Sequence, residues 1–334
     1  MTDLAVTVLP ATAPAAPEAP DAPDAPDAPV ADPSAWGVAP ARRAVRDAGA
    51  REVPLGDETR MLVVGGKVDQ DELRAAIDDH PGIAVVQLPS AGVDAYVETM
   101  RATARDGLVF TSAKGAYSAP VAEHALALTL ATLRSLQVRA RASSWETRQR
   151  GITLNGSRVV VIGAGGIGTE LLRLLAPFDA HVTMVVRTAR EVEGADRTVT
   201  TDRLDEVLPE ADVVVVAAAL TEGTTRLVGG AQLAAMKQTA VLVNIARGPL
   251  VDTDALVAAL AEGSIGAAGL DVVDPEPLPD GHPLWSEPRA LITPHQADTL
   301  EMIEPLFHDR VRANVEALAA GRPAEGVVDV EAGY

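Results

Sequence analysis

The 334-residue sequence contains no cysteine. This absence excludes disulfide bonds, thiolate metal ligands and a cysteine nucleophile, and it suits a reducing compartment. Basic residues are outnumbered as well, with 28 Lys and Arg against 47 Asp and Glu. The formal net charge is therefore −19, and the isoelectric point is about 4.7. Binding to a phosphate backbone needs a basic field, so nucleic acid is not an expected partner.

Long apolar runs are also missing. The longest purely apolar run, Val213 to Leu220, is too short to span a bilayer, and the first basic side chain, Arg42, comes too late for a charged leader. We therefore expect a soluble, cytoplasmic protein with no membrane partner. No metal site is predicted.

The N-terminal region differs in composition from the rest of the chain. Leu4 to Pro10 could form a short first strand. From Ala11 to about Pro33 the sequence repeats Ala, Pro and Asp, which is too polar and too rich in proline to pack. We interpret residues 1–35 as a partly disordered segment with no assigned chemistry.

A glycine-rich turn is the strongest local feature. Val159 to Ile162 form an unbroken β-branched run that predicts a strand buried on both faces. The spacing Gly163-x-Gly165-x-x-Gly168 follows, and then an apolar stripe predicts a helix that ends at Pro177. In this setting Gly163 suits a tight bend, Gly165 a close approach to a pyrophosphate, and Gly168 packing of helix on strand. A strand-turn-helix without a ligand is the alternative.

Aliphatic runs alternate with helical patterns along the rest of the chain. This alternation predicts parallel sheets with helices on both faces and ligands at the carboxyl ends of the strands. The other expected strands are Met61–Val64, Ile83–Leu88, Val109–Thr111, Val182–Val186, Val213–Val216, Val241–Asn244, Ala267–Leu270 and Leu291–Thr293. The expected helices include Ala39–Ala48, Asp71–Ile77, Leu204–Leu208, Gln232–Met236 and Asp254–Ala261.

A long apolar helix is predicted from Val121 to about Gln137. Its two faces rich in alanine and leucine are more than one sheet can cover. We therefore expect one face to meet a second subunit in a homodimer. A buried helix between domains is the alternative.

Three polar residues come directly after expected strands. Arg247 follows Val241–Asn244, Glu276 lies in the turn after Ala267–Leu270, and His295 follows Leu291–Thr293. Each alone has an ordinary explanation as a solvated or structural side chain. Together they offer an imidazole for proton transfer, a carboxylate to fix its tautomer and a guanidinium to bind a carboxylate. The exposed amides of Pro89–Asp94 could hold a carboxylate too, although a plain turn is an equal alternative.

The motifs resemble those of the D-isomer-specific 2-hydroxyacid dehydrogenases. They are the Gly163–Gly168 turn, N-I-A-R-G-P-L-V-D from Asn244, G-L-D-V-V-D-P-E-P-L from Gly269, and T-P-H from Thr293. The resemblance runs from about Met61 to about Asp329. It implies a Rossmann-type doubly wound parallel sheet inserted into a second, flavodoxin-like α/β domain. The substrate-binding domain would comprise 36–115 plus 299–334, and the dinucleotide-binding domain 116–298.

The resemblance also implies roles for individual residues. His295 would be the acid/base, Glu276 its orienting partner, and Arg247 the ligand of the substrate carboxylate and keto oxygen. The remaining implied contacts are Ala91, Gly92 and Val93 to the same carboxylate, Ala246 and Asp271 to the nicotinamide end, and Gly163, Gly165, Ile167 and Gly168 to the cofactor.

The residue directly after Val182–Val186, the second expected strand of the dinucleotide-binding domain, indicates which cofactor binds. Many members of the family have an acidic residue there, which bonds the adenosine ribose, but this chain has Arg187, followed by Thr188 and Arg190. Because two arginines can clamp a 2′-phosphate, we predict NADP(H) over NAD(H). Two solvated arginines are the alternative.

The first hypothesis is an enzyme that transfers a hydride between NAD(P)H and a small 2-oxo acid, of the glyoxylate or hydroxypyruvate type, to give the D-2-hydroxy acid. Alternatives are a cofactor-sensing, corepressor-like interaction protein and a phosphoglycerate or phosphite dehydrogenase. The presence of all three polar residues favours the enzyme, because a sensor needs no proton donor. The N-terminal half has no extra basic cluster for a substrate phosphate.

Overall fold

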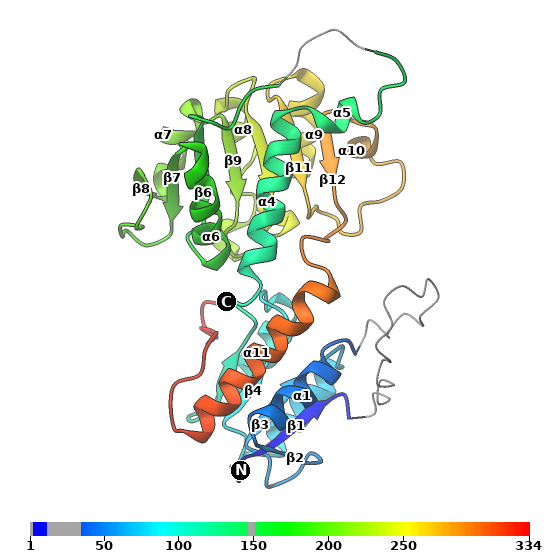
Figure 1. Ribbon diagram of the computed structural model, residues 1–334, viewed down its shortest axis with the longest axis vertical. Coiled ribbons are helices and arrows are strands. Elements are labelled where there is room, and N and C mark those ends of the chain that lie inside the picture. The colour runs from blue at the N-terminus through cyan, green and yellow to red at the C-terminus, as the bar shows by residue number, and fades with distance from the viewer. Residues whose placement is uncertain (1–2, 12–34, 146–150) are drawn as a thin grey trace. The chain divides into compact units, whose positions relative to one another are not determined.

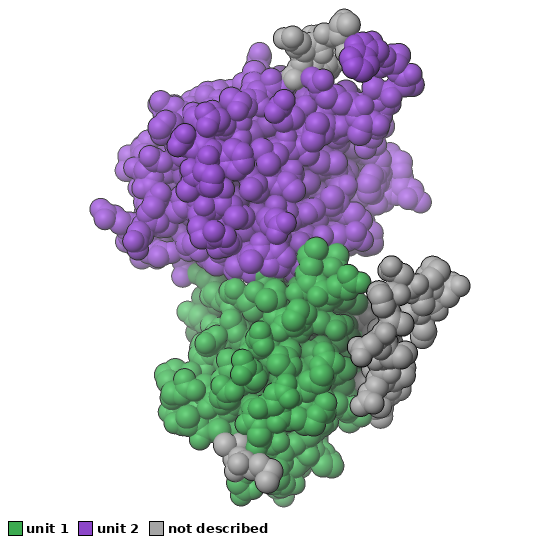
Figure 2. Space-filling view, viewed as in Figure 1, with its two compact units in different colours: residues 1–117, 299–334 green, residues 118–298 purple. Residues whose placement is uncertain are grey.

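The computed structural model describes residues 3–11, 35–145 and 151–334. The chain divides into two compact units, one formed by Met1–Tyr117 with Thr299–Tyr334 and the other by Ser118–Asp298 (Figure 2). Nearly all of the segment rich in alanine, proline and aspartate lies outside the described residues. The backbone passes between the units twice, after Tyr117 and after Asp298.

The first unit is built on a five-stranded parallel sheet with the strand order β2-β1-β3-β4-β5 (Figure 1). This is the flavodoxin-like order. The strands β1, β3 and β4 are buried along their whole length, and most of their residues are aliphatic. They therefore form the centre of an aliphatic core. The strands are β1 (Ala5–Leu9), β2 (Arg51–Glu52), β3 (Met61–Val64), β4 (Val85–Gln87) and β5 (Val109–Thr111), and the helices from the first part of the chain are α1 (Val38–Asp47), α2 (Gln70–Asp78) and α3 (Val97–Thr103).

The last long helix, α11 (Leu300–Ala319), returns to the first unit and packs against α1 (Figure 1). Two polar side chains of α11 reach the strand ends. Buried Arg310 donates to the carbonyl oxygens of Ser112 at 2.8 Å and Lys114 at 3.0 Å. The Asn314 amide donates to Gln87 Oε1 at 2.7 Å. The segment after β5 is thus tied to a helix that lies almost 200 residues further along, because Ser112 and Arg310 are 198 positions apart.

The second unit holds a seven-stranded parallel sheet with the order β12-β11-β10-β9-β6-β7-β8. The chain starts in the middle at β6, moves outward through β7 and β8, and then crosses to β9 and continues to β12. The topological switch point therefore lies between β6 and β9, where ligands bind in such sheets. The strands are β6 (Arg158–Ile162), β7 (His181–Val186), β8 (Arg197–Thr200), β9 (Val213–Val216), β10 (Val241–Asn244), β11 (Ala267–Leu270) and β12 (Ala290–Ile292).

Helices cover both faces of this sheet. Alternate residues of β6, Val160 and Ile162, share one core with the helices α7 to α9. On the other face α4 packs against α6 and lies on β10 and β11. The helices are α4 (Ser118–Leu133), α5 (Leu136–Arg139), α6 (Gly166–Leu175), α7 (Leu204–Val207), α8 (Gly230–Ala235), α9 (Thr253–Glu262) and α10 (Pro283–Ser286).

The predicted fold class, a Rossmann-type parallel sheet together with a second parallel α/β unit, is confirmed. The long helix predicted to reach Gln137 is interrupted instead. Ser135 has φ = 50°, a left-handed conformation that separates α4 from α5. Within the described residues, no helix has the length and apolar character needed to cross a membrane.

Candidate active site

The glycine turn lies at the switch point of the second sheet. Gly163 directly follows β6 with φ = 111°, and a Cβ there would overlap the backbone of Ala217 after β9. A Cβ at Gly168 would overlap the carbonyl oxygen of Gly163, which shows how closely α6 packs on the turn. Gly165 differs from both, because no heavy atom lies within 4 Å of the place where its Cβ would stand. The turn therefore leaves open space before the first amides of α6, where an anion is favoured.

Arg247 is positioned by a turn that starts at the end of β10. The side chain of buried Asn244 accepts from the Ala246 N–H at 3.1 Å and donates to the Arg247 carbonyl at 3.0 Å. Gly248 follows, and a Cβ there would overlap the backbone of Val273 after β11. The Arg247 side chain is half-buried and donates to the Ala246 carbonyl at 2.7 Å. Local bonds thus place the guanidinium at the carboxyl end of β10.

His295 and Glu276 form a direct pair. His295 Nδ1 lies 2.6 Å from Glu276 Oε1, and both side chains are partly exposed, at 47% and 41%. A carboxylate only accepts, so Nδ1–H donates and the tautomer is assigned from this bond. Nε2 is then the ring nitrogen outside this contact. Exposed pairs of this kind add little stability, and a carboxylate bonded to Nδ1 fixes the orientation of a histidine ring.

The backbone of His295 is strained. Its φ is 50°, in the left-handed region, where a residue with a Cβ costs about 1 to 2 kcal/mol. The His295 N–H donates to the carbonyl oxygen of Asp271 at 2.7 Å. Such strain persists only where neighbouring contacts fix the backbone, and it is common at functional sites.

Asp271 supplies those contacts. Its side chain is only 1% exposed. One carboxylate oxygen accepts from the Thr293 hydroxyl at 2.7 Å and the Gln296 N–H at 2.9 Å, and the other accepts from the Ala297 N–H at 3.1 Å. Burial alone would raise the pKa of Asp271, but the nearby His124 ring, the Thr293 hydroxyl and the Gln296 N–H outweigh it and lower the pKa. The carboxylate therefore stays ionised.

A second carboxyl group, Asp298, lies in the electrostatic field of both candidate cations. Burial raises its pKa, His295 and Arg247 oppose that rise, and Asp271 adds to it. Of the three predicted residues, the structure brings His295 and Glu276 into contact, and Arg247 follows β10 in the same unit.

The predicted adenosine-end residues follow β7. Arg187, Thr188 and Arg190 are all exposed. The Arg190 guanidinium donates to the carbonyl oxygen of Ala164 at 2.8 Å, so it lies beside the glycine turn. Of the other predicted cofactor contacts, Ile167 is half-buried in the first turn of α6 and Ala246 is buried after β10.

The predicted carboxylate loop lies in the first unit, after β4. Tyr117 donates to the Pro89 carbonyl at 2.7 Å, and Ser90 donates to the Gly92 carbonyl at 2.6 Å. Among the described residues, no hydrogen bond is donated by the N–H groups of the three predicted residues. These residues are Ala91, Gly92 and Val93. The bonds from Tyr117 and Ser90 hold the loop through its carbonyl oxygens. The N–H groups of the loop therefore remain available to an anion.

Sequence reasoning missed His124, Thr293 and Asp298. His124 lies on α4, and its Nε2 is 2.9 Å from Thr293 Oγ1. The two residues are 169 positions apart, and no local pattern signals such a contact. The packing of α4 on the sheet brings the two residues together.

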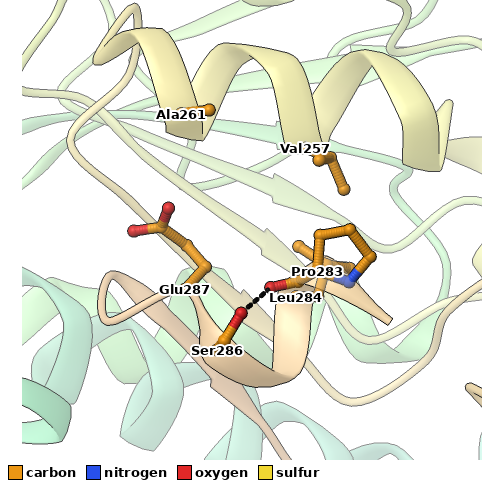
Figure 3. A pocket seen from close by; sticks show the side chains of 6 residues that line it. All are labelled: Val257, Ala261, Pro283, Leu284, Ser286 and Glu287. Carbon is orange, nitrogen blue, oxygen red and sulfur yellow. Dashed lines mark hydrogen bonds between the residues drawn. The ribbon is translucent and has the colours of Figure 1, made fainter. Parts of the chain in front are cut away.

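A small surface pocket of about 200 Å³ lies between α9 and α10 (Figure 3). Its walls are mainly apolar, Ser286 bonds to the Pro283 carbonyl, and the Glu287 carboxylate pairs with Arg289. The pocket contains none of the predicted site residues. The lining residues are Val257, Ala261, Pro283, Leu284, Ser286 and Glu287.

Comparison with known proteins agrees with this geometry. The family model described as "D-isomer specific 2-hydroxyacid dehydrogenase, NAD binding domain" matches residues 124–297. An uncharacterized protein of Corynebacterium melassecola, from the proB 3′ region, is 42% identical over 257 residues, which are 75% of this chain and 84% of that protein. A glyoxylate reductase of Thermofilum pendens is 32% identical over 281 residues and 81% of each chain.

A solved structure gives the same result. The D-isomer specific 2-hydroxyacid dehydrogenase of Xanthobacter autotrophicus Py2, in complex with NADPH and MES, is 27% identical and matches all of both chains with a TM-score of 0.77. This chain therefore belongs to the D-isomer specific 2-hydroxyacid dehydrogenase family, and the family predicted from its motifs is confirmed. It is an oxidoreductase with an NAD(P)-binding Rossmann domain, and it acts on the CH–OH group of its donors.

Proposed function

We propose that this protein uses NADPH to reduce a small 2-oxo acid of the glyoxylate or hydroxypyruvate type to the D-2-hydroxy acid. The observation that carries the proposal is the His295–Glu276 pair, with its 2.6 Å contact, at the same edge of the sheet as the glycine turn. The Thermofilum pendens relative named glyoxylate reductase supports the substrate class.

The glycine turn fits a dinucleotide. The space above Gly165 is open, and the first amides of α6 face it, as a pyrophosphate requires. When bound, the nicotinamide supplies a hydride to carbon C2 of the oxo acid. Arg190, bonded to the turn at Ala164, and Arg187 are the residues that we expect at the adenosine end.

The chain's own residues bind the acid and move the proton. Arg247 binds the carboxylate and the carbonyl oxygen of the acid with two parallel N–H donors. Protonated His295 donates from Nε2 to the carbonyl oxygen, so the C=O bond becomes C–OH and the ring becomes neutral. Glu276 remains a carboxylate and accepts from Nδ1–H throughout. A proton from water restores the imidazolium.

A direct assay tests the activity. We expect oxidation of NADPH, followed at 340 nm, with glyoxylate or hydroxypyruvate, and the product should be the D isomer where C2 is chiral. A panel of pyruvate, phenylpyruvate and 3-phosphohydroxypyruvate defines the substrate range. Absence of turnover with every 2-oxo acid, in both directions, would contradict the proposed function.

The cofactor preference can be reversed at Arg187. Charge-assisted hydrogen bonds to a phosphate contribute about 1.5 to 3 kcal/mol, so Arg187→Asp should lower the ratio of kcat/KM for NADPH over NADH by tenfold or more. Steady-state kinetics with both cofactors measure the ratio. Arg203→Asp is the matched control, because it makes the same charge change at an exposed arginine that pairs with Glu206 instead. An unchanged ratio in Arg187→Asp would refute this assignment.

We also propose a homodimer formed through α4 and α5. Leu136 is 50% exposed and Trp145 is 94% exposed, and Leu126 and Leu130 are only half-buried on α4. An apolar surface of this kind marks an interface. Leu136→Glu should reduce the mass measured by light scattering from that of two chains to that of one. A wild-type protein with the mass of one chain would rule the dimer out. The cytoplasmic location stays a prediction.

A further inference from the structure

His124 connects a helix to the loop that carries His295. It lies on α4, its side chain is 21% exposed, and its Nε2 is 2.9 Å from Thr293 Oγ1 and 3.4 Å from Asp271 Oδ1. All of these residues belong to the second unit.

The direction of the hydrogen bonds follows from the number of protons. The single Thr293 hydroxyl proton goes to Asp271 Oδ1 at 2.7 Å. Thr293 Oγ1 must therefore accept from His124, and Nε2 carries the proton. The result is a chain of donors from His124 through Thr293 to Asp271.

Asp271 connects this chain of hydrogen bonds to the loop that carries His295. Its carboxylate accepts from the amides of Gln296 and Ala297, and its carbonyl oxygen accepts from the amide of His295. These bonds flank a residue whose φ of 50° is unfavourable by itself. A shift of the Thr293 or Asp271 side chain would therefore break these bonds. The backbone at His295, which sets the direction of its imidazole, would then change conformation.

We propose that His124 is a positioning residue for the reaction, because it holds Thr293 and Asp271 in the arrangement that fixes the His295 loop. This inference rests on the proposed role of His295 as the acid/base. His124 touches neither substrate nor cofactor in this scheme. It acts through the hydrogen bonds from His124 to Thr293 and from Thr293 to Asp271. These bonds fix the position from which His295 Nε2 delivers its proton.

The test compares His124→Leu with His124→Gln. Leucine removes the donor, whereas the glutamine amide nitrogen can occupy the place of Nε2. Because a misplacement of about 1 Å can cost about a hundredfold in rate, we expect kcat for His124→Leu to fall about tenfold to a hundredfold. The Kd for NADPH, measured by fluorescence, should not change. His124→Gln should recover most of kcat. If leucine does not fold, His124→Asn, which is too short to reach Thr293, takes its place.

A double-mutant cycle separates positioning from general loss of stability. Thr293→Val should reproduce the loss of kcat, and the double variant His124→Leu/Thr293→Val should be no worse than either single one, because all three break the same chain of bonds. Thr132→Val is the control on the same helix. Among the described residues its hydroxyl bonds only within α4, to the Leu128 and Thr129 carbonyls, so kcat should be unchanged.

The outcomes distinguish this inference from the proposed function. If replacement of His295 leaves turnover intact, the proposed function is wrong. If replacement of His295 abolishes turnover but His124→Leu keeps kcat within about twofold, or the two losses multiply in the double variant, the positioning role of His124 is wrong.

Discussion

His295→Asn should lower kcat for reduction of the oxo acid by about a hundredfold to ten-thousandfold, the usual contribution of a positioned general acid. Asparagine suits this test because it tolerates the left-handed backbone that His295 adopts, with φ = 50°. The loop should therefore keep its shape while the proton donor is lost. Stopped-flow and steady-state assays with saturating NADPH measure kcat, and fluorescence titration measures NADPH binding, which should persist.

Glu276→Gln provides a graded comparison. The amide oxygen can still accept from His295 Nδ1–H, but it lacks the charge that stabilises the imidazolium. We expect a smaller fall in kcat, by about fivefold to thirtyfold, because a bond to a charged group is worth about 1 to 2 kcal/mol more than a neutral one. Near-normal kcat in His295→Asn, at any pH between 5 and 9, would remove His295 from the mechanism.

Arg247→Lys should raise KM for the oxo acid about tenfold to a hundredfold, since lysine replaces a planar fork of donors by a single point charge. The guanidinium is held by its bond to the Ala246 carbonyl and by the turn that Asn244 shapes, so the loss is local. Steady-state kinetics over a range of oxo acid concentrations give KM and kcat separately.

Arg289→Lys is the matched control for Arg247. Arg289 is a half-buried guanidinium in the same unit, and it pairs with Glu287 at 2.9 Å. This change should leave KM for the oxo acid unaltered. Equal effects of the two substitutions, or an unchanged KM in Arg247→Lys, would show that Arg247 does not bind the carboxylate.

Most strands could be predicted because they are buried on both faces. Val213–Val216 and Val241–Asn244 have the predicted bounds, and each is buried throughout. The edge strand β8 was missed because it reads Arg-Thr-Val-Thr and buries only Val199. The two residues of β2 are both exposed, so they carry no apolar signal either.

The rule that side chains following parallel strands gather at one edge of the sheet indicated where a site would lie. The resemblance implied that Glu276 is the partner of His295, and the structure has His295 Nδ1 2.6 Å from Glu276 Oε1. The interruption at Ser135 and the contact of His124 with Thr293 depend on how a helix sits on the sheet. Neither follows from local periodicity, because tertiary packing determines both.

The return of α11 to the first unit has a consequence for biosynthesis. The ribosome completes residues 118–298 before it makes the helix whose Arg310 and Asn314 bind the segment after β5 and Gln87. Domains generally fold as units during translation. The inserted dehydrogenase domain can therefore fold on the nascent chain, whereas the domain that encloses it must wait, with its β1–β5 sheet uncovered by α11, until synthesis is nearly finished.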